Sequence, residues 1–183
     1  MFRLLTLTSI LVTMFSCKKE NKDYAIIAND PIIYHKSVKA LTDVIVHDIF
    51  SPPVASRIYA YASIAGYEGA RYLDSSYVSL SGQISHLSTF PLPEKGQEYC
   101  WPMVSTVAFL LTGKTLIFSE DRIDTAMQSA LKFYEKTGMS KDIFDRSNAY
   151  AKQISDHVIA WSSSDNYKQS RSFPKYSLQN DPA

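Results

Sequence analysis

Apolar residues recur at three- and four-residue spacing along most of the chain, which is the pattern of amphipathic helices. The first such helix is expected from Asp30-Pro31 to about Phe50, and its apolar stripe consists of Val38, Leu41, Thr42, Ile45 and Ile49. Asp30 is a suitable helix cap, and Pro31 fits a first helical turn. The Ser51-Pro52-Pro53 segment ends this helix, because a residue that precedes proline avoids the helical region.

A second helix is expected from about Val54 to Leu73, with Ser51 as its cap. Nine of its twenty residues are Ala, Gly or Ser. Residues of this size let neighbouring helices approach closely, so the sequence predicts that this is the central helix of a bundle. Arg57 and Glu68 share one of its faces but lie about three turns apart. Each is therefore expected to meet a partner on another helix.

The helical pattern resumes after one long interruption. Residues 74–98 contain Ser-Ser, Ser-Gly and Pro91-Leu92-Pro93 without a lasting period, so we expect a loop with at most one short turn near residues 80–86. Three more helices are predicted from Tyr99 to Phe118, from Ser119 to Thr137 and from Ser140 to about Ser164. The tail from Asp165 onward has no apolar stripe. The predicted fold class is all-α, a bundle of about five helices.

The segment 99–118 is apolar enough to be compared with a membrane span. Pro102, the interior Ser105 and Thr106, and Lys114 weigh against a span and favour a buried core helix.

The first residues of the chain form a separate unit. Arg3 is followed by an apolar run from Leu4 to Phe15 that is too short to cross a bilayer, and Met14-Phe15-Ser16-Cys17 is similar to a lipobox. We therefore expect a lipoprotein signal peptide over residues 1–17, lipid on Cys17, a polar tether over 18–30 and a helical domain over 31–183. The protein is then expected in the bacterial cell envelope, membrane-anchored through lipid and facing the periplasm. A plain secretory signal with an incidental cysteine is the alternative.

Composition narrows the function classes. The chain has 183 residues, 45% of them hydrophobic and 20% charged, and a formal net charge of +1. These values describe one globular unit, and the even spread of basic residues excludes a nucleic-acid-binding surface. With Cys17 lipidated, Cys100 has no intramolecular partner, and a lone cysteine in an apolar stretch is expected to be a core residue.

Few residues suggest chemistry of their own. His47-Asp48, with His35 upstream, is similar to the metal-binding pair of HD-type phosphohydrolases, but metal sites need several converging ligands, so a capping or inter-helix role is favoured for His47. Asp43 offers His47 a helical hydrogen-bond partner. Glu68 is the acid most expected to be buried, either for proton transfer or, as we favour, in a pair with an arginine or tyrosine. Glycine motifs for phosphate and the Gly-x-Ser-x-Gly elbow are absent. We assign no catalytic, cofactor-binding or metal-binding residue.

Several stretches resemble the N-terminal helical region of bacterial vanadium-dependent haloperoxidase-like proteins, which belong to the type 2 phosphatidic acid phosphatase superfamily. These stretches are His47–Asp74, Pro93–Gly96 with Tyr99-Cys100, Lys114–Asp121, and Trp161 through Lys168 to Arg171-Ser172-Phe173-Pro174. The resemblance implies that the chain is an incomplete half of a larger all-helical fold.

That superfamily holds phosphate or vanadate with three motifs, Lys-x6-Arg-Pro, Pro-Ser-Gly-His and Ser-Arg-x5-His, whose cations neutralise the oxyanion. None occurs here: Lys114 to Arg122 is one residue too long and lacks the proline, and neither Ser56-Arg57 nor Ser170-Arg171 is followed by a suitably spaced histidine.

The resemblance therefore implies a haloperoxidase-like or acid-phosphatase-like lipoprotein half that is inactive alone. Vanadate or phosphate would bind an absent C-terminal half, and that half or a second copy of the chain is the expected partner. The alternative is a stand-alone envelope lipoprotein that binds a partner or a small ligand.

Overall fold

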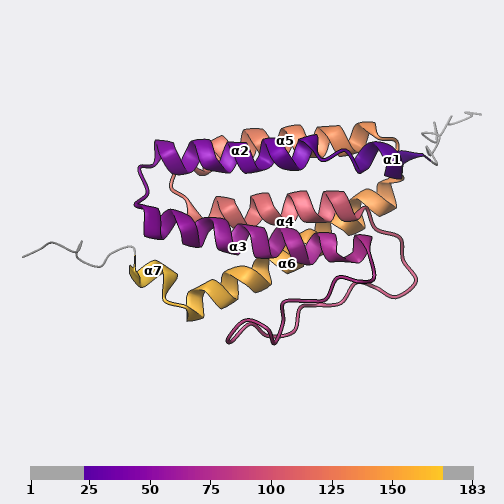
Figure 1. The fold of residues 1–183 in the computed structure, drawn as a ribbon. Helices are drawn as coiled ribbons and strands as arrows, with labels where there is room; N and C mark the ends of the chain where they lie inside the picture. Colours follow the sequence, from indigo (N-terminus) through magenta and orange to yellow (C-terminus); the bar gives the residue numbers. More distant parts are fainter. Residues whose placement is uncertain (1–22, 171–183) are drawn as a thin grey trace, which may run out of the picture.

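The computed structural model describes residues 23–170, which form helices joined by one long loop (Figure 1). The helices are α1 (Tyr24–Ala28), α2 (Ile32–His47), α3 (Pro52–Ala70), the 3-10 helix η1 (Arg71–Leu73), α4 (Trp101–Leu116), α5 (Glu120–Lys136), α6 (Lys141–Ser164) and α7 (Tyr167–Ser170). Residues 23–170 contain no strand. The prediction of an all-α bundle built on about five helices is confirmed by the five long helices α2 to α6.

The long helices lie in layers. In Figure 1, α2 and α5 run side by side above α3 and α4, and α6 crosses on the other side of that pair. The segment between η1 and α4 runs back along α6 as an extended loop, in agreement with the predicted interruption. The two ends of the described range lie at opposite ends of the bundle.

The central helix is α4, and the prediction that α3 would be central is wrong. Eleven of the sixteen residues of α4 are buried, because α2, α3, α5 and α6 all pack against it. A helix that is apolar all round can be surrounded in this way. Small residues in α3 indicated close packing but not central position.

Close packing between α3 and α4 does depend on those small residues. A Cβ atom added to Gly69 would lie 2.7 Å from the backbone nitrogen of Ser105. The Ser105 hydroxyl donates to the Gly66 carbonyl at 2.7 Å. The two backbones therefore approach so closely that no side chain fits between them at Gly69.

The cap predicted at Asp30 is confirmed, whereas the side chain of Ser51 does not make the cap predicted for it. The Asp30 carboxylate accepts from Ile32 N at 2.9 Å, and the Ser140 hydroxyl oxygen accepts from Ile143 N at 3.3 Å. Neither Ser51 nor Ser119 caps through its side chain. Ser51 instead uses its backbone carbonyl, which accepts from the first free amides after the two prolines.

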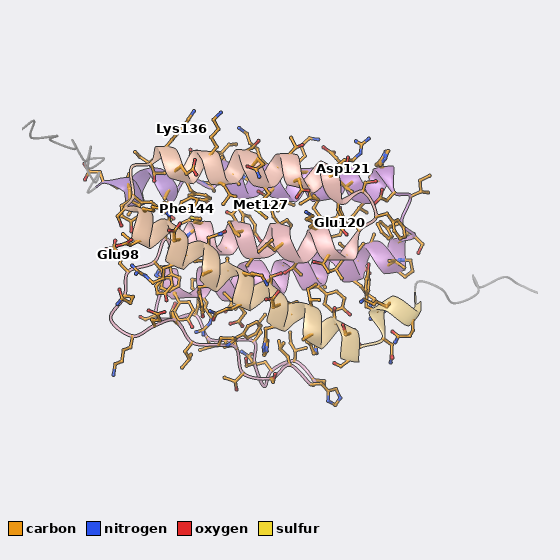
Figure 2. The ribbon with its side chains drawn as sticks, turned by 180° about the vertical axis from the view of Figure 1, so that it is seen from behind. Glu98, Glu120, Asp121, Met127, Lys136 and Phe144 are labelled. Atoms are coloured by element: carbon orange, nitrogen blue, oxygen red, sulfur yellow. The ribbon has the colours of Figure 1, made fainter. Side chains whose placement is uncertain are left out.

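Charges at the ends of α5 follow the helix dipole. Figure 2 shows Glu120 and Asp121 at the start of α5 and Lys136 at its end. Acidic residues are stabilised near a helix N-terminus and basic ones near a C-terminus. This agrees with the predicted start of the helix at Ser119-Glu120-Asp121.

The predicted stripe of α2 is wrong at its last residue. Leu41 and Ile45 are buried, but α2 ends at His47 and the Ile49 side chain is 88% exposed. Ile49 has a φ of 55°, in the left-handed region that β-branched residues rarely adopt. The reversed backbone turns the chain toward α3 and directs Ile49 away from the core.

Two short helices lie where the sequence suggested none. Residues 24–28 were expected in the polar tether, but α1 buries Tyr24 and Ala28 in the core. The tail was expected to be irregular from Asp165, but it contains α7, whose Tyr167 is buried. Five and four residues are too few for a helical stripe to be recognised. The signal peptide, Cys17 and the resemblance at Arg171-Ser172-Phe173-Pro174 lie outside the described residues.

Within residues 23–170, no helix is both long enough and apolar enough to cross a membrane. The apolar segment predicted as a core helix is α4.

Candidate functional site

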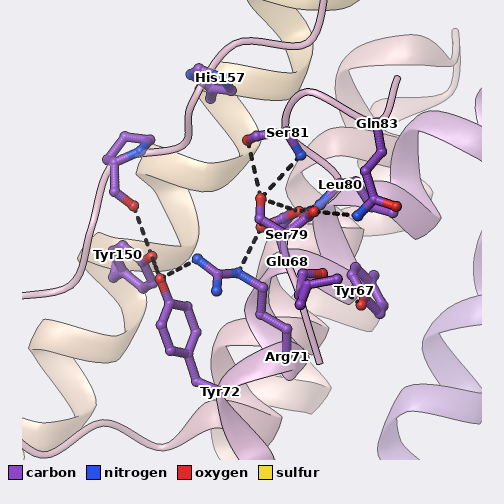
Figure 3. A network of polar contacts seen from close by, with 12 residues as sticks. Tyr67, Glu68, Arg71, Tyr72, Ser79, Leu80, Ser81, Gln83, Tyr150 and His157 are labelled. Carbon is purple, nitrogen blue, oxygen red and sulfur yellow. Dashed lines mark hydrogen bonds and ion pairs between the residues drawn. The ribbon is translucent and has the colours of Figure 1, made fainter. Parts of the chain in front are cut away.

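Glu68 is the acid that the sequence predicts to be buried, and the structure leaves only 1% of its surface exposed. Its two carboxylate oxygens accept from Leu80 N at 2.7 Å, from Arg71 Nε at 2.8 Å and from the Ser79 hydroxyl at 3.0 and 3.1 Å (Figure 3). The predicted pairing with an arginine is correct. The partner comes from η1 and the loop, however, and not from a neighbouring helix.

The Glu68 network continues through Arg71 toward α6. Arg71 Nη2 donates to the Tyr72 hydroxyl at 2.6 Å, which lies 3.2 Å from the Tyr150 hydroxyl (Figure 3). The Tyr150 hydroxyl donates to the Pro91 carbonyl at 2.9 Å. Burial, followed by the hydrogen bond with Tyr72, raises the pKa of Tyr150 far above its ordinary value. These contacts connect the end of α3 with α6 across the loop and use the polar groups as structural links.

Side chains on one face of α6 hold the loop over residues 85–98. Four of them donate to loop carbonyls, in the pairs Arg146 with Glu98, Tyr150 with Pro91, His157 with Ser88 and Trp161 with Ser85, at 2.9 to 3.2 Å. Their spacings of four, seven and four residues place them on one side of the helix. The sequence predicts the apolar stripe of α6 but not these four polar contacts, because the backbone carbonyls that accept them leave no signal in a sequence.

Arg57 lies at the other end of α3 in a second polar cluster. Its guanidinium donates to the Tyr61 hydroxyl at 2.8 Å and to the Asp165 carboxylate at 2.9 Å. The Tyr61 hydroxyl also donates to Asp165. Hydrogen bonds from Tyr61 and then Arg57 lower the pKa of Asp165, and burial followed by the bond to Asp165 raises the pKa of Tyr61 to about 12. Arg57 was predicted to meet a partner on another helix; its partners are Tyr61 of the same helix and Asp165, which caps the C-terminus of α6 and lies just outside it.

The His47-Asp48 pair lies at an end of the bundle. His47 is exposed, and Asp43 pairs with Lys39 instead of His47. The Asp48 carboxylate accepts from Phe118 N at 2.8 Å, from Ser119 N at 3.0 Å and from the Ser119 hydroxyl at 2.5 Å. Desolvation opposes the effect, but hydrogen bonds from Ser119 and Phe118 lower the pKa of Asp48. Asp48 thus stabilises the turn between α4 and α5. Residues 23–170 contain no group of three or more His, Cys, Asp or Glu placed to hold a metal ion.

Cys100 is a core residue, as predicted. Its backbone amide donates to the Ser147 hydroxyl at 2.9 Å, and burial raises the pKa of the thiol to about 11. A thiol with so high a pKa is a poor nucleophile. The adjacent Trp101 ring stacks on Tyr72 and Tyr99 at 4.6 and 4.9 Å.

A cavity of about 380 Å³, which we call the Tyr34 cavity, opens among α2, α3, α4 and α5. It is lined by Asn29, Asp30, Pro31, Tyr34, Ser63, Gly66, Tyr67, Ala70, Leu73, Pro102, Ser105, Thr106 and Tyr134. The size is in the range of small-molecule sites. No local sequence pattern indicates this cavity, because its walls come from four separate stretches of the chain.

The sequence matches no known protein-family model and no curated protein. Its structure is similar to a solved structure described as the first bacterial vanadium-dependent iodoperoxidase, with 37% sequence identity and a TM-score of 0.75. The similarity covers 83% of this chain and 36% of that one. The protein therefore has a haloperoxidase-like helical fold, as the resemblance implied, and spans little more than a third of the length of that iodoperoxidase.

Proposed function

We propose that this chain is the helical N-terminal part of a vanadium-haloperoxidase-like protein and that the oxyanion-binding groups come from polypeptide outside the matched region. The similarity to the bacterial iodoperoxidase carries the proposal, since it is close over most of this chain but covers only 36% of the other. The sequence supports it too, because the three oxyanion motifs are absent from all 183 residues.

The charges in the bundle agree with a scaffold role. Arg57 pairs with Asp165, Arg71 with Glu68 and Lys114 with Asp124, each within 2.9 Å. Chemistry on phosphate or vanadate needs several cations that converge on one anion. These three basic side chains are instead neutralised by carboxylates of the same chain, and they lie in three different places.

An exposed apolar patch offers a surface for additional polypeptide. Val46, Ile49 and Phe118 are exposed at one end of the bundle, and Phe118 stacks on Phe50 at 4.8 Å. Several exposed apolar side chains at one end of a domain agree with an interaction site there. The left-handed conformation that directs Ile49 outward also supports an interface here, because strained conformations persist at functional positions.

Activity assays test the proposal. The purified full chain, supplied with vanadate, is expected neither to oxidise iodide with peroxide nor to hydrolyse a phosphomonoester. Addition of a separately expressed polypeptide that carries the three oxyanion motifs, if neighbouring DNA encodes one, is expected to restore activity. The Ile49→Asp/Phe118→Asp variant is then expected to weaken the association, whereas Ile26→Asp at the opposite end serves as the matched control. Turnover by the chain alone would overturn the proposal.

We further propose that lipid on Cys17 anchors the protein to a membrane of the bacterial envelope. The lipobox-like Met14-Phe15-Ser16-Cys17 and the polar residues after it support this proposal. In a Gram-negative host, the wild-type chain is expected in the membrane fraction, and Cys17→Ala in the soluble or unprocessed fraction. Cys100→Ala is the matched control and is expected to fractionate as wild type. Normal processing and membrane retention of Cys17→Ala would contradict the anchor.

A further inference from the structure

Ser63 lies exposed at the mouth of the Tyr34 cavity, and the other hydroxyl groups that line it are of two kinds: four donate to backbone carbonyls, and that of Tyr34 does not. Ser105 donates to Gly66 O at 2.7 Å, Thr106 to Pro102 O at 2.9 Å, Tyr134 to Pro102 O at 3.0 Å and Tyr67 to Val78 O at 2.8 Å. None of the hydrogen bonds among residues 23–170 involves the Tyr34 hydroxyl. No buried side-chain nitrogen or oxygen within residues 23–170 lacks a partner, so the Tyr34 hydroxyl is a donor that solvent or a ligand can reach at the cavity.

Packing fixes the Tyr34 side chain at this position. Its ring lies against Phe109 with centroids 5.3 Å apart, and its hydroxyl lies where a Cβ on Gly66 would be only 2.4 Å away. Glycine at position 66 therefore makes room for the phenol. Burial raises the pKa of Tyr34 to about 12, so the hydroxyl keeps its proton and acts as a donor at neutral pH.

The walls select a neutral and mainly apolar molecule. Among residues 23–170, Asp30 is the one charged residue that lines the cavity, and its carboxylate already accepts from Ile32 N. Three tyrosines, two prolines, Leu73 and Ala70 supply aromatic and aliphatic surface. An anion would be repelled by Asp30 and would find no cation among the described residues of the walls, and burial of an unpaired charge is costly.

We propose that the Tyr34 cavity binds a small neutral aromatic molecule that accepts a hydrogen bond from the Tyr34 hydroxyl through a carbonyl or ether oxygen. The fixed position of the donor, the saturation of the other buried hydroxyls and the apolar walls together define this ligand class. The site goes beyond the scaffold role and depends on neither the oxyanion motifs nor a partner.

A matched pair of probes separates shape from hydrogen bonding. We would titrate the purified full chain into 4-fluoroacetophenone, which carries a carbonyl acceptor, and into 1-ethyl-4-fluorobenzene, which has a similar shape without it, and follow both by fluorine NMR. Wild type is expected to bind the ketone more tightly. Tyr34→Phe is expected to weaken ketone binding roughly three- to tenfold, the net effect of one hydrogen bond, and to leave the hydrocarbon unchanged.

Variants that alter the cavity locate the site. Ala70→Leu places a larger side chain in the cavity and is expected to abolish binding of both probes. Ser129→Leu adds the same side chain to a separate groove between α2 and α5 and is expected to change neither. Circular dichroism checks each fold, and Ser63→Leu at the exposed mouth replaces Ala70→Leu if that variant does not fold.

Three results would overturn the proposal: neither probe binds to wild type, binding survives a folded cavity-filling variant, or Tyr34→Phe affects both probes equally. Each leaves the scaffold proposal intact, because that proposal is tested by reconstituted activity.

Discussion

Two polar clusters lie on α3 about three turns apart, one around Arg57 and one around Glu68. Both contain an ion pair and a tyrosine, but the side chain of Glu68 is 1% exposed and that of Arg71 15%, whereas Arg57 and Asp165 are 28% and 53% exposed. Water can replace lost contacts in the Arg57 cluster but not around Glu68. Burial, more than residue type or helical spacing, therefore determines how much each cluster contributes to stability.

The largest expected effect comes from removal of the buried charge. Glu68→Gln leaves the partly buried Arg71 without a counter-charge and weakens the contacts with Ser79 and Leu80. We expect a loss of about 3 kcal/mol in the free energy of unfolding, measured by urea titration. Glu68→Gln/Arg71→Met is the control and is expected to recover part of that loss. A loss below about 1 kcal/mol for Glu68→Gln would show that the Glu68–Arg71 pair contributes no more than an exposed salt bridge, which would contradict the account.

Gly69→Ala is expected to have the next largest effect. The added methyl meets the α4 backbone at 2.7 Å, so the two helices must separate. We expect destabilisation by about 2 kcal/mol, within the usual cost of overpacking. Ser63→Ala, at an exposed position of the same helix, is the control and is expected to stay within about 0.5 kcal/mol of wild type. Equal stabilities of the two variants would show that the close approach of α3 and α4 is wrong.

The link between α6 and the loop is expected to have a smaller and more local effect. Tyr150→Phe removes the hydrogen bond to the Pro91 carbonyl and the contact with Tyr72. A loss of about 1 kcal/mol is expected, together with faster amide hydrogen exchange in residues 85–98. Tyr77→Phe, at an exposed tyrosine of the same loop, should leave exchange unchanged. Unchanged exchange in Tyr150→Phe would show that α6 does not hold the loop.

The smallest effect is expected in the Arg57 cluster. Asp165→Asn is expected to cost less than about 1 kcal/mol, because the pair is partly exposed. In the wild-type protein, the pKa of Asp165 is lower in the folded state than in the unfolded state. The contribution of Asp165 to stability is therefore fully present above the unfolded pKa of about 3.9 and disappears as pH falls through the folded pKa. The difference between wild type and Asp165→Asn should shrink in acid unfolding series below about pH 4. A difference that grows as pH falls would contradict this sign.

The sequence predicted the features that depend on local pattern and missed those that depend on contacts between distant segments. The five long helices follow from apolar stripes and breaks such as Ser51-Pro52-Pro53, which act within a few residues. Burial of Glu68 and Cys100 was also predicted, since both lie among small or apolar neighbours. The central position of α4, the outward turn at Ile49 and the burial of α1 depend on contacts between distant segments. The walls of the Tyr34 cavity come from four such segments, so no local pattern could indicate it.

A vanadate titration followed by vanadium-51 NMR tests the central claim, that the clusters on α3 are structural and the chain alone forms no oxyanion site. With the purified full chain, we predict no saturable broadening of the vanadate signal, and the same result for Arg57→Met. Stoichiometric, saturable broadening that disappears in Arg57→Met would contradict the claim and identify the Arg57 cluster as an oxyanion site.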